Sequence, residues 1–454
     1  MVEIFARKFR WVLFLCAASL LIASCTNYKI PEVVDVSSCE GCHTNLAHLK
    51  EVFTADTAAV VGGCGGEAPH YEPWERVNMT GDGYAAFKAS SHGALSCTSC
   101  HGGINGTDQK DIAHSEDFVR HPSDNWETKC LPCHSEVEHF GNSLHNGTGQ
   151  KRKVAMRSGY AGAHEFDMLS EQTKTGYENN CATCHGTCGN CHIVRPPIAG
   201  GGLSNGHEFI KQPHMTKICV SCHTSRGGHA FLGVAAGTVP DVHQDEHNFQ
   251  CTSCHKGPEL HGSSDSTVTN RYEYAELPSC QSTYCHPSIE NSNNYHSTHI
   301  EDFNCQVCHS QDYNNCGSCH VHGDGARVPA YMDFKIALNP IPDVKQGYDF
   351  VLVRRTLGAP DNWSKYGADD YENFDVFPTY NFTTPHNILK LTTRTDVGSG
   401  DACYTNCHVR YDAENDTTYN KHLYLFSDDM EFEWENSANA SIIVDGLLPA
   451  SWME

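Results

Sequence analysis

The sequence is poor in basic residues, in methionine and in long apolar runs. Its 454 residues carry 31 Lys and Arg against 55 Asp and Glu, which gives a formal net charge of −24. This surplus of negative charge argues against nucleic acid as a partner, because its phosphates would be repelled. Hydrophobic residues make up only 39% of the chain, whereas glycine (38) and proline (19) are plentiful. Such a chain cannot build a conventional core along its whole length, so bound groups are expected to supply much of the buried apolar surface.

The most apolar stretch lies at the start of the chain. Three basic residues within positions 7–10 precede the apolar run 11–23, which ends close to Cys25. A charged start, an apolar centre and a small-residue end are typical of an export signal. A transmembrane anchor is the less favoured alternative, because the run is shorter than the roughly 20 residues that a span needs. The end of the run also resembles a bacterial lipoprotein box, so we expect residues 1–24 to be a signal peptide and Cys25 to carry a lipid anchor.

Cysteine is abundant, and 22 of the 25 cysteines fall into pairs that are followed directly by a histidine. The densest stretch, residues 181–192, holds two Cys-x-x-Cys-His units separated by two residues. Nine strict units occur, where chance would supply about 0.1, and two stretched units have four and three spacers. The cysteine pairs are Cys39 and Cys42, Cys97 and Cys100, Cys130 and Cys133, Cys181 and Cys184, Cys188 and Cys191, Cys219 and Cys222, Cys251 and Cys254, Cys280 and Cys285, Cys305 and Cys308, Cys316 and Cys319, and Cys403 and Cys407. The adjoining histidines are His43, His101, His134, His185, His192, His223, His255, His286, His309, His320 and His408.

A Cys-x-x-Cys-His unit is the attachment site of a c-type haem. Both thiols bond to the haem, and the adjoining histidine becomes the proximal iron ligand. Zinc knuckles do not need a histidine directly after every second cysteine, and disulfide scaffolds give no reason for eleven such histidines. The sequence therefore predicts about eleven covalently attached haem c groups. The three residues from His185 to Cys188 span at most about 10 Å, so we expect the two central haems to be stacked.

The remaining side chains suggest how each iron is completed. Nineteen further histidines are enough to give every haem a second one, whereas the eight methionines show no repeated spacing to a unit. Bis-histidine ligation is therefore favoured, and it gives lower potentials than His/Met ligation. His92, His214, His247 and His299 stand four to six residues before a unit, too close to reach the far face of their own haem, so we expect them to ligate a neighbouring one. For any single one of the nineteen further histidines, a surface role remains an alternative to iron ligation. Cys64 belongs to no pair, and a free or intermolecular thiol is favoured for it over a ligand or redox role.

The haem units and the leader resemble the multihaem c-type cytochromes of bacterial respiratory and extracellular electron-transfer chains. Over about residues 90–410, several short segments are similar to a poorly characterised group of these cytochromes. The segments are Asn205-Gly206-His207, Asp241-Val242-His243, Glu259 to Gly262, Tyr295 to His299, Cys305 to Gln311 and Thr384 to Ile388. The resemblance implies that the distal ligands are His207, His243, His261, His296, His299 and His386, with His92 next. The stretched unit at Cys403 and the extra first unit at Cys39 depart from the pattern.

With about 39 residues per haem, we expect a haem-organised, mostly irregular coil with short α-helices and a small β-containing C-terminal segment. The expected parts are an N-terminal extension with one haem (25–90), a haem-dense core with nine haems (91–326), a haem-free aromatic and β insert (327–402), and a last haem with an acidic tail (403–454).

The insert carries the clearest strand patterns. The stretches 334–338 and 348–354 alternate in a way that predicts strands. We expect the aromatic side chains of the insert to pack on haem faces or on each other, although a covering loop is an equal alternative and a substrate-binding or docking insert a third. These are Trp363, Tyr366, Tyr371, Phe374, Phe377 and Tyr380. The acidic residues between 428 and 435 predict a partly exposed tail.

These features favour electron transfer by an exported undecahaem cytochrome, with other cytochromes or quinol-linked proteins as redox partners. It would be a lipoprotein of the outer membrane or cell surface, or a periplasmic protein, that carries electrons of anaerobic respiration to an acceptor outside the cytoplasm. The competing hypothesis is a reductase for a small nitrogen or sulfur oxyanion at one open haem, although no Cys-x-x-Cys-Lys variant occurs. A self-assembled or porin-inserted conduit is the third.

Overall fold

The computed structural model describes most of the chain after the leader. The described residues are 35–55, 69–146, 148–235, 237–265, 268, 271–274, 277–313, 334–355, 360–361, 363–368, 371–398 and 401–449. The predicted signal peptide 1–24, the predicted anchor Cys25, the thiol of Cys64 and the unit Cys316, Cys319 and His320 lie outside them. Within these ranges, no helix combines the length and the apolar character needed to cross a membrane.

Short helices joined by irregular segments make up most of the fold. About 41% of the structure is helical, and the two longest helices have ten residues each. The α-helices are α2 (Cys39–Thr44), α3 (Leu46–Val52), α4 (Asp82–Ala89), α5 (Cys97–His101), α6 (Lys110–Ala113), α7 (Trp126–Lys129), α8 (Thr148–Arg157), α9 (Glu171–Asn180), α10 (Cys188–His192), α11 (Val220–His223), α12 (His229–Phe231), α13 (Val242–His247), α14 (Cys251–Cys254), α15 (Gly257–Leu260), α16 (Asn294–His299), α17 (Cys305–His309) and α18 (Glu433–Asn439). The strands are β1 (Phe334–Leu338), β2 (Phe350–Arg355), β3 (Tyr380–Phe382), β4 (Arg410–Asp412) and β5 (Thr417–Tyr419). Helices this short are not stable alone, so the fold depends on what they contact.

Five of the predicted haem units begin a helix at their first cysteine, namely those on α2, α5, α10, α14 and α17. In α2 and α5 the preceding serine, Ser38 or Ser96, caps the helix by accepting a hydrogen bond from the third backbone N–H that follows it. Positions i, i+3 and i+4 share one face of a helix. One helical turn therefore brings both thiols and the imidazole of a unit to the same side.

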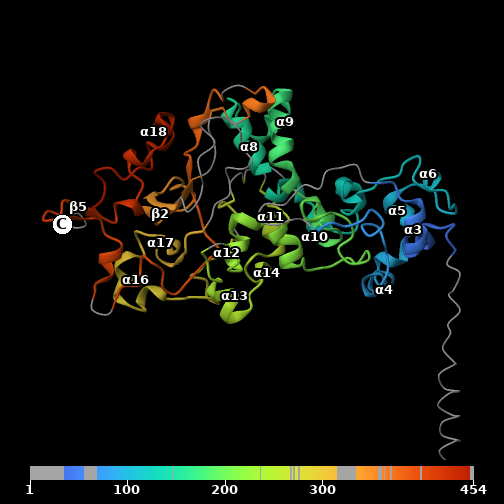
Figure 1. The fold of residues 1–454 in the computed structure, drawn as a ribbon, viewed down its shortest axis with the longest axis horizontal. Helices are drawn as coiled ribbons and strands as arrows, with labels where there is room; N and C mark the ends of the chain where they lie inside the picture. The colour runs from blue at the N-terminus through green and yellow to red at the C-terminus, as the bar shows by residue number, and fades with distance from the viewer. Residues whose placement is uncertain are drawn as a thin grey trace, which may run out of the picture.

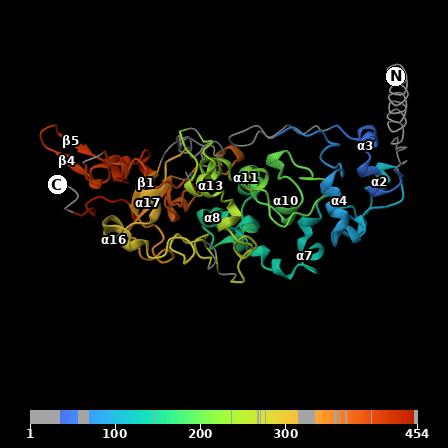
Figure 2. The same ribbon diagram turned by 90° about the horizontal axis from the view of Figure 1, so that it is seen from below.

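The chain runs along the long axis of the molecule. The two views show α2 to α5 at one end, α10 and α11 near the middle, and β4 and β5 at the opposite end (Figures 1 and 2). Helices α16 and α17 lie between the middle and the C-terminal end. The predicted attachment sites are thus spread along the molecule in approximately the order of the sequence.

The two stretches expected as strands form β1 and β2 of a three-stranded antiparallel sheet in the order β1-β2-β3, with β2 in the centre. Strand β1 has the expected bounds, and β2 begins at Phe350, two residues later than expected. In the register, Leu338 pairs with Phe350 and Val353 pairs with Phe382. Strand β3 comes from the far end of the insert, so the sheet closes the insert on itself.

This sheet is buried on both faces and holds the unit on α17 in place. Successive side chains point to opposite faces, so Leu352 enters one apolar cluster and Val353 another. The Asn304 side chain, which precedes α17, accepts a hydrogen bond from the Leu352 backbone N–H at 3.1 Å. The backbone N–H of Phe350 donates to Asp302 at 2.8 Å. The insert therefore positions the segment that starts the unit at Cys305.

The acidic C-terminal segment contains one fully buried carboxylate. Glu435 of α18 is 1% exposed, and its Oε1 accepts hydrogen bonds from Arg355 Nε at 3.0 Å and from Thr379 at 3.1 Å. Its second oxygen binds the Arg355 guanidinium directly, while the half-exposed Glu431 binds the same group at 3.2 Å. The tail expected to be partly exposed is thus tied to β2 by a buried ion pair.

The aromatic insert packs against α8 and α9. The Trp363 side chain is 4% exposed and lies on Gly176 of α9, where a Cβ atom would come within 2.5 Å of the indole. The Tyr371 ring stands 5.9 Å from Trp363, and both pack with Tyr177 in one apolar cluster. The orange segment in Figure 1 shows the insert beside these two helices. Among the described residues, these aromatic side chains therefore pack on one another.

Candidate functional site

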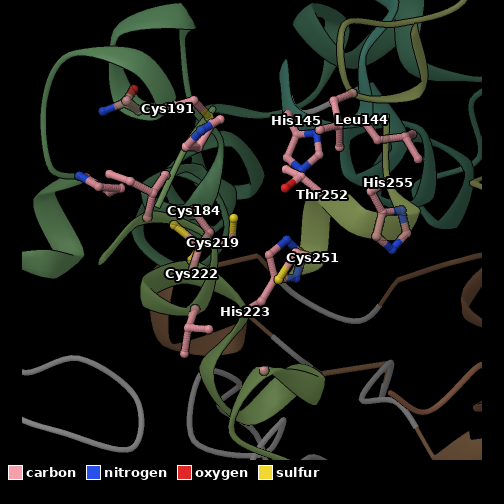
Figure 3. A pocket seen from close by; sticks show the side chains of 18 of the residues that line it. Leu144, His145, Cys184, Cys191, Cys219, Cys222, His223, Cys251, Thr252 and His255 are labelled. Carbon is pink, nitrogen blue, oxygen red and sulfur yellow. The ribbon is translucent and has the colours of Figure 1, made fainter. Parts of the chain in front are cut away.

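The predicted attachment groups line one continuous cavity of about 4950 Å³. Each of the nineteen described cysteines of the units borders it. A pocket for one small molecule has a volume of roughly 300–1,000 Å³, so this cavity has room for many groups. Figure 3 shows part of it, with the thiols of Cys184, Cys219 and Cys222 gathered on one side and the rings of His145 and His223 facing each other. The cavity follows the chain from the first unit to the last.

Nine proximal histidines face a second histidine at nearly the same distance. The ring centroids of each pair are 5.8 to 6.3 Å apart. The pairs are His43 with His114, His101 with His207, His134 with His92, His192 with His261, His223 with His145, His255 with His386, His286 with His243, His309 with His296, and His408 with His299. One distance recurs although the pairs come from different elements.

This recurring distance is the one that a metal ion between two imidazoles requires. A metal–nitrogen bond to histidine is about 2.0 Å long, and each ligating nitrogen lies about 1.1 Å from the centre of its ring, so two opposed rings should stand about 6.2 Å apart. The observed range brackets this value. The residues present therefore fit a haem iron between the two rings of each pair, with the cysteine pair at the edge of the porphyrin.

Hydrogen bonds engage Nδ1 in many of these rings, so Nε2 is the nitrogen that could bind a metal. The Nδ1 of His101 donates to the Val119 carbonyl at 3.0 Å, and that of His192 donates to Ile210 at 2.7 Å. The Nδ1 of His255 donates to the Glu259 carboxylate at 2.8 Å. Similar bonds hold His43, His114, His134, His243, His299 and His309. A partner at one ring nitrogen sets the tautomer and the ring direction, as in other histidine metal sites.

Burial also keeps several of these imidazoles in the neutral form that binds metal. Desolvation lowers the pKa of His207 to about 4 and that of His386 to about 4. It also lowers the pKa of His43, His101, His145 and His261. In contrast, the hydrogen bond with Asp241 raises the pKa of His243. For the buried rings, ligation does not have to displace a proton at neutral pH.

All seven distal histidines expected from the sequence face a proximal one. These are His92, His207, His243, His261, His296, His299 and His386. Sequence reasoning missed His114 and His145. The sequence does contain a signal for His145, because the dipeptide Leu144-His145 repeats the dipeptide Leu260-His261. In the structure these two segments are in contact, since Ser143 Oγ donates a hydrogen bond to the Leu260 carbonyl at 2.8 Å. For His114 the sequence carries no comparable signal.

The two stretched units are arranged like the strict ones. His286 stands 6.2 Å from His243, and His408 stands 6.3 Å from His299. The unit at Cys280 is built from turns, and the unit at Cys403 from one turn of 3-10 helix. Extra spacer residues thus leave the imidazole opposite a second histidine.

The unit at Cys181 and Cys184 has different surroundings. The phenol ring of Tyr177 stacks toward His185, with centroids 6.2 Å apart and planes inclined by 25°. Cys181 packs against an apolar cluster that includes Tyr177, Trp363 and Tyr371. The aromatic insert therefore covers this unit.

Contacts between cysteines of different units give the spatial order of the attachment sites. Hydrogen-bonded thiols join Cys130 to Cys188, Cys184 to Cys222, Cys219 to Cys251, and Cys280 to Cys305. Longer-range electrostatic interactions act between the thiols of Cys39 and Cys97, Cys100 and Cys130, Cys191 and Cys219, and Cys254 and Cys285. The Tyr424 side chain contacts both Cys407 and Cys308. The two central units, adjacent in sequence, thus each contact a unit that is distant in sequence.

Several other histidines contact carboxylates on the surface. His70 binds Glu72 at 3.2 Å, and His139 binds Glu138 at 3.1 Å. These contacts agree with a surface role for some of the histidines that neither follow a cysteine pair nor face a proximal histidine.

Comparison with protein-family models, with curated proteins and with solved structures finds no match for this chain.

Proposed function

We propose that this chain is a multihaem c-type cytochrome that transfers single electrons along a row of about eleven covalently attached haems. The observation that carries the proposal is the set of nine histidine pairs with ring centroids 5.8 to 6.3 Å apart. Each pair includes the histidine that directly follows a cysteine pair. A purely structural role for these histidines gives no reason for one recurring distance.

When bound, haem supplies an iron that accepts and releases one electron without proton chemistry by the protein. The protein chain would attach each haem, orient its ligands and shield it from water. The cysteine pairs hold the porphyrin edge, while Nδ1 hydrogen bonds such as that of His101 to Val119 hold the imidazoles in place. Paired histidines favour lower potentials than a His/Met pair would.

The sulfur contacts support a continuous path. In the haem-loaded protein each sulfur would be bonded to its porphyrin, so two sulfurs that lie close together would bring two porphyrin edges together. Hydrogen-bonding or electrostatic interactions between sulfurs link the units whose first cysteines are 39, 97, 130, 188, 219, 251, 280 and 305 in that order. The Tyr424 side chain then links Cys308 to Cys407 of the last unit. The unit at Cys181 joins this row through Cys184 and Cys222. The path thus extends along the long axis with one branch.

The proposed setting is outside the cytoplasm, where a lipid anchor at Cys25 would hold the protein to the outer membrane or the cell surface. Redox partner proteins, such as another cytochrome or a quinol-linked donor, would supply and remove electrons at the ends of the row. The first and last units lie at opposite ends of the molecule (Figures 1 and 2). Such a layout suits one partner at each end.

A second candidate is reduction of a small nitrogen or sulfur oxyanion at one haem. The observation that favours it is the distinct surroundings of the Cys181 unit, where Tyr177 stacks toward His185 and the insert closes over the site.

A reductive titration of the purified full-length protein tests the leading proposal. The intact mass should exceed the polypeptide mass by about eleven haems, and full reduction should consume one electron per haem. A protein that carries no covalent haem would overturn the proposal. Full haem content with reduction of only a minority of the haems would count against a connected row.

A further inference from the structure

A cluster of positive side chains stands out in this acidic protein. Helix α8 presents Arg152, Lys153 and Arg157 around the ring of Phe377. The Arg152 guanidinium carbon lies 5.5 Å from the ring centroid, and the Lys153 Nζ and the Arg157 guanidinium carbon each lie 6.0 Å from it. Three cations therefore share one small space although the chain has a net charge of −24.

The charges around this cluster are mostly of the same sign. The groups that act electrostatically on Lys153 are Arg271, Arg157, Arg152 and Arg354, all of them cations. The Tyr371 phenol also acts electrostatically on Arg157. Enclosed charges of one sign are costly unless an anion compensates them. The cluster therefore calls for a negative group that the described side chains do not provide.

Two buried donors point to where that group binds. Arg157 Nε and Trp363 Nε1 have almost no solvent-accessible surface and no hydrogen-bond acceptor among the described residues. Both residues line the large cavity. Trp363 is itself 4% exposed. A buried donor that is left without an acceptor destabilises the fold, so each of these two donors is expected to meet an acceptor in the cavity.

This space adjoins the attachment site at Cys181. The Tyr371 phenol interacts electrostatically with both Arg157 and Cys181. Cys181 and Ala182 also pack against the apolar cluster that includes Val154 of α8 and the Trp363 side chain. The donors and the unit therefore share one enclosure, with the insert as its outer wall.

We propose that Arg152, Lys153, Arg157, Trp363 and Tyr371, the α8 cation pocket, bind a small inorganic oxyanion beside the haem attached at Cys181 and Cys184. This inference rests on the proposed function, because it takes the Cys181 unit to carry haem. An oxyanion has several acceptor oxygens, so it can meet the guanidinium, the indole N–H and the phenol together. The contact between Cys184 and Cys222 joins this site to the main row of units.

The same chemistry could be met by a carboxylate of the porphyrin itself, and the experiment separates the two sources. The full-length protein, with its haem content measured first, is titrated with sulfite and in a second series with nitrite. Binding is followed by calorimetry and by the electron paramagnetic resonance (EPR) spectrum of the ferric protein. We expect saturable binding of one anion per chain with a change in one ferric signal.

Two variants probe the pocket, and a third is the control. Arg157→Gln removes a charge and should weaken anion binding at least tenfold. Trp363→Phe keeps an aromatic ring but removes the donor and should weaken binding severalfold, and this variant keeps the test valid where Arg157→Gln does not fold. Lys174→Gln alters the exposed Lys174–Glu171 pair on α9 and should bind like the unchanged protein.

Absence of saturable binding in fully haem-loaded protein would overturn the inference and leave the electron-transfer proposal standing. The inference would also be overturned if Arg157→Gln and Trp363→Phe both bound the anion as tightly as the protein without substitutions. Loss of haem or a shifted potential in Arg157→Gln without loss of anion affinity would assign the cations to the porphyrin carboxylates. A protein isolated without covalent haem would instead overturn the proposed function itself.

Discussion

Replacing Glu259 by glutamine should raise the midpoint potential of the haem that we propose to be ligated by His255. The Glu259 carboxylate accepts a hydrogen bond from His255 Nδ1 at 2.8 Å, and its side chain is 13% exposed. A negative charge near the iron stabilises the ferric state more than the ferrous state, because ferric iron carries one more positive charge. Removing that charge favours reduction and raises the potential.

The magnitude follows from the distance. The carboxylate lies about 7 Å from the expected iron position, once the imidazole and a metal–nitrogen bond of about 2.0 Å are included. At an effective dielectric constant of about 20, Coulomb's law gives about 2.4 kcal/mol for unit charges at this distance. For a one-electron couple this corresponds to about 100 mV. Glutamine can still accept the Nδ1 hydrogen bond, so the substitution chiefly removes the charge.

Two further variants calibrate this result. Glu136 makes the same kind of contact with His134, at 2.9 Å, but its side chain is 64% exposed. Water and salt screen an exposed charge, so Glu136→Gln should give a much smaller rise. Glu171, which is 86% exposed and contacts Lys174, provides a matched control whose replacement by glutamine should leave all potentials unchanged.

The assay is a potentiometric titration of the full-length protein followed by EPR. One low-spin ferric signal should titrate at a higher potential in Glu259→Gln. Identical titrations in Glu259→Gln and the unchanged protein would refute the assignment of His255 as an iron ligand oriented by Glu259. Equal shifts in all three variants would show that the effect is not local.

Three other outcomes test separate parts of the structure. Glu435→Gln should lower the free energy of unfolding by about 3 kcal/mol, because it leaves the buried Arg355 guanidinium with less countercharge. Denaturant unfolding followed by circular dichroism would measure this loss. The same loss of stability on replacing the exposed Glu433 by glutamine would contradict the prediction. Replacing Cys280 and Cys285 together by alanine should reduce the intact mass by the mass of one haem. A mass that corresponds to only nine haems in the protein without substitutions would refute haem attachment at both stretched units. Burial and neighbouring guanidinium groups lower the pKa of Lys153 to about 7, so anion binding measured by calorimetry should weaken as the pH rises through about 7, and a constant affinity would exclude a role for its charge.

The local part of the candidate site could be predicted from the sequence. Both thiols and the histidine of a unit lie within a few residues, so their spacing alone indicates attachment. The short capped helices, such as α5 after Ser96, follow from the same local pattern.

The pairing of histidines could be predicted only in part, because it joins residues that are far apart in the chain. His386 reaches His255 from across the insert, and His299 reaches His408. Resemblance indicated which histidines are distal, but the choice of partner depends on tertiary contacts. His114 was missed because it lies at the end of a four-residue helix with no motif around it.

The α8 cation pocket could not be predicted from the sequence for the same reason. Arg157 and Trp363 are some 200 residues apart, and Trp363 reaches α8 and α9 only because the insert folds back over them. The aromatic residues of the insert suggested packing, and a substrate-binding insert was one of the alternatives. The sequence contains no signal that joins this insert to the Cys181 unit.

The spin state of the irons tests the central claim most directly. Quantitative EPR of the fully oxidised, full-length protein should show that most of the iron is low-spin, with at least nine bis-histidine centres to match the nine observed pairs. A spectrum in which high-spin iron predominates would contradict the account, because it would show that the paired histidines do not ligate the haems.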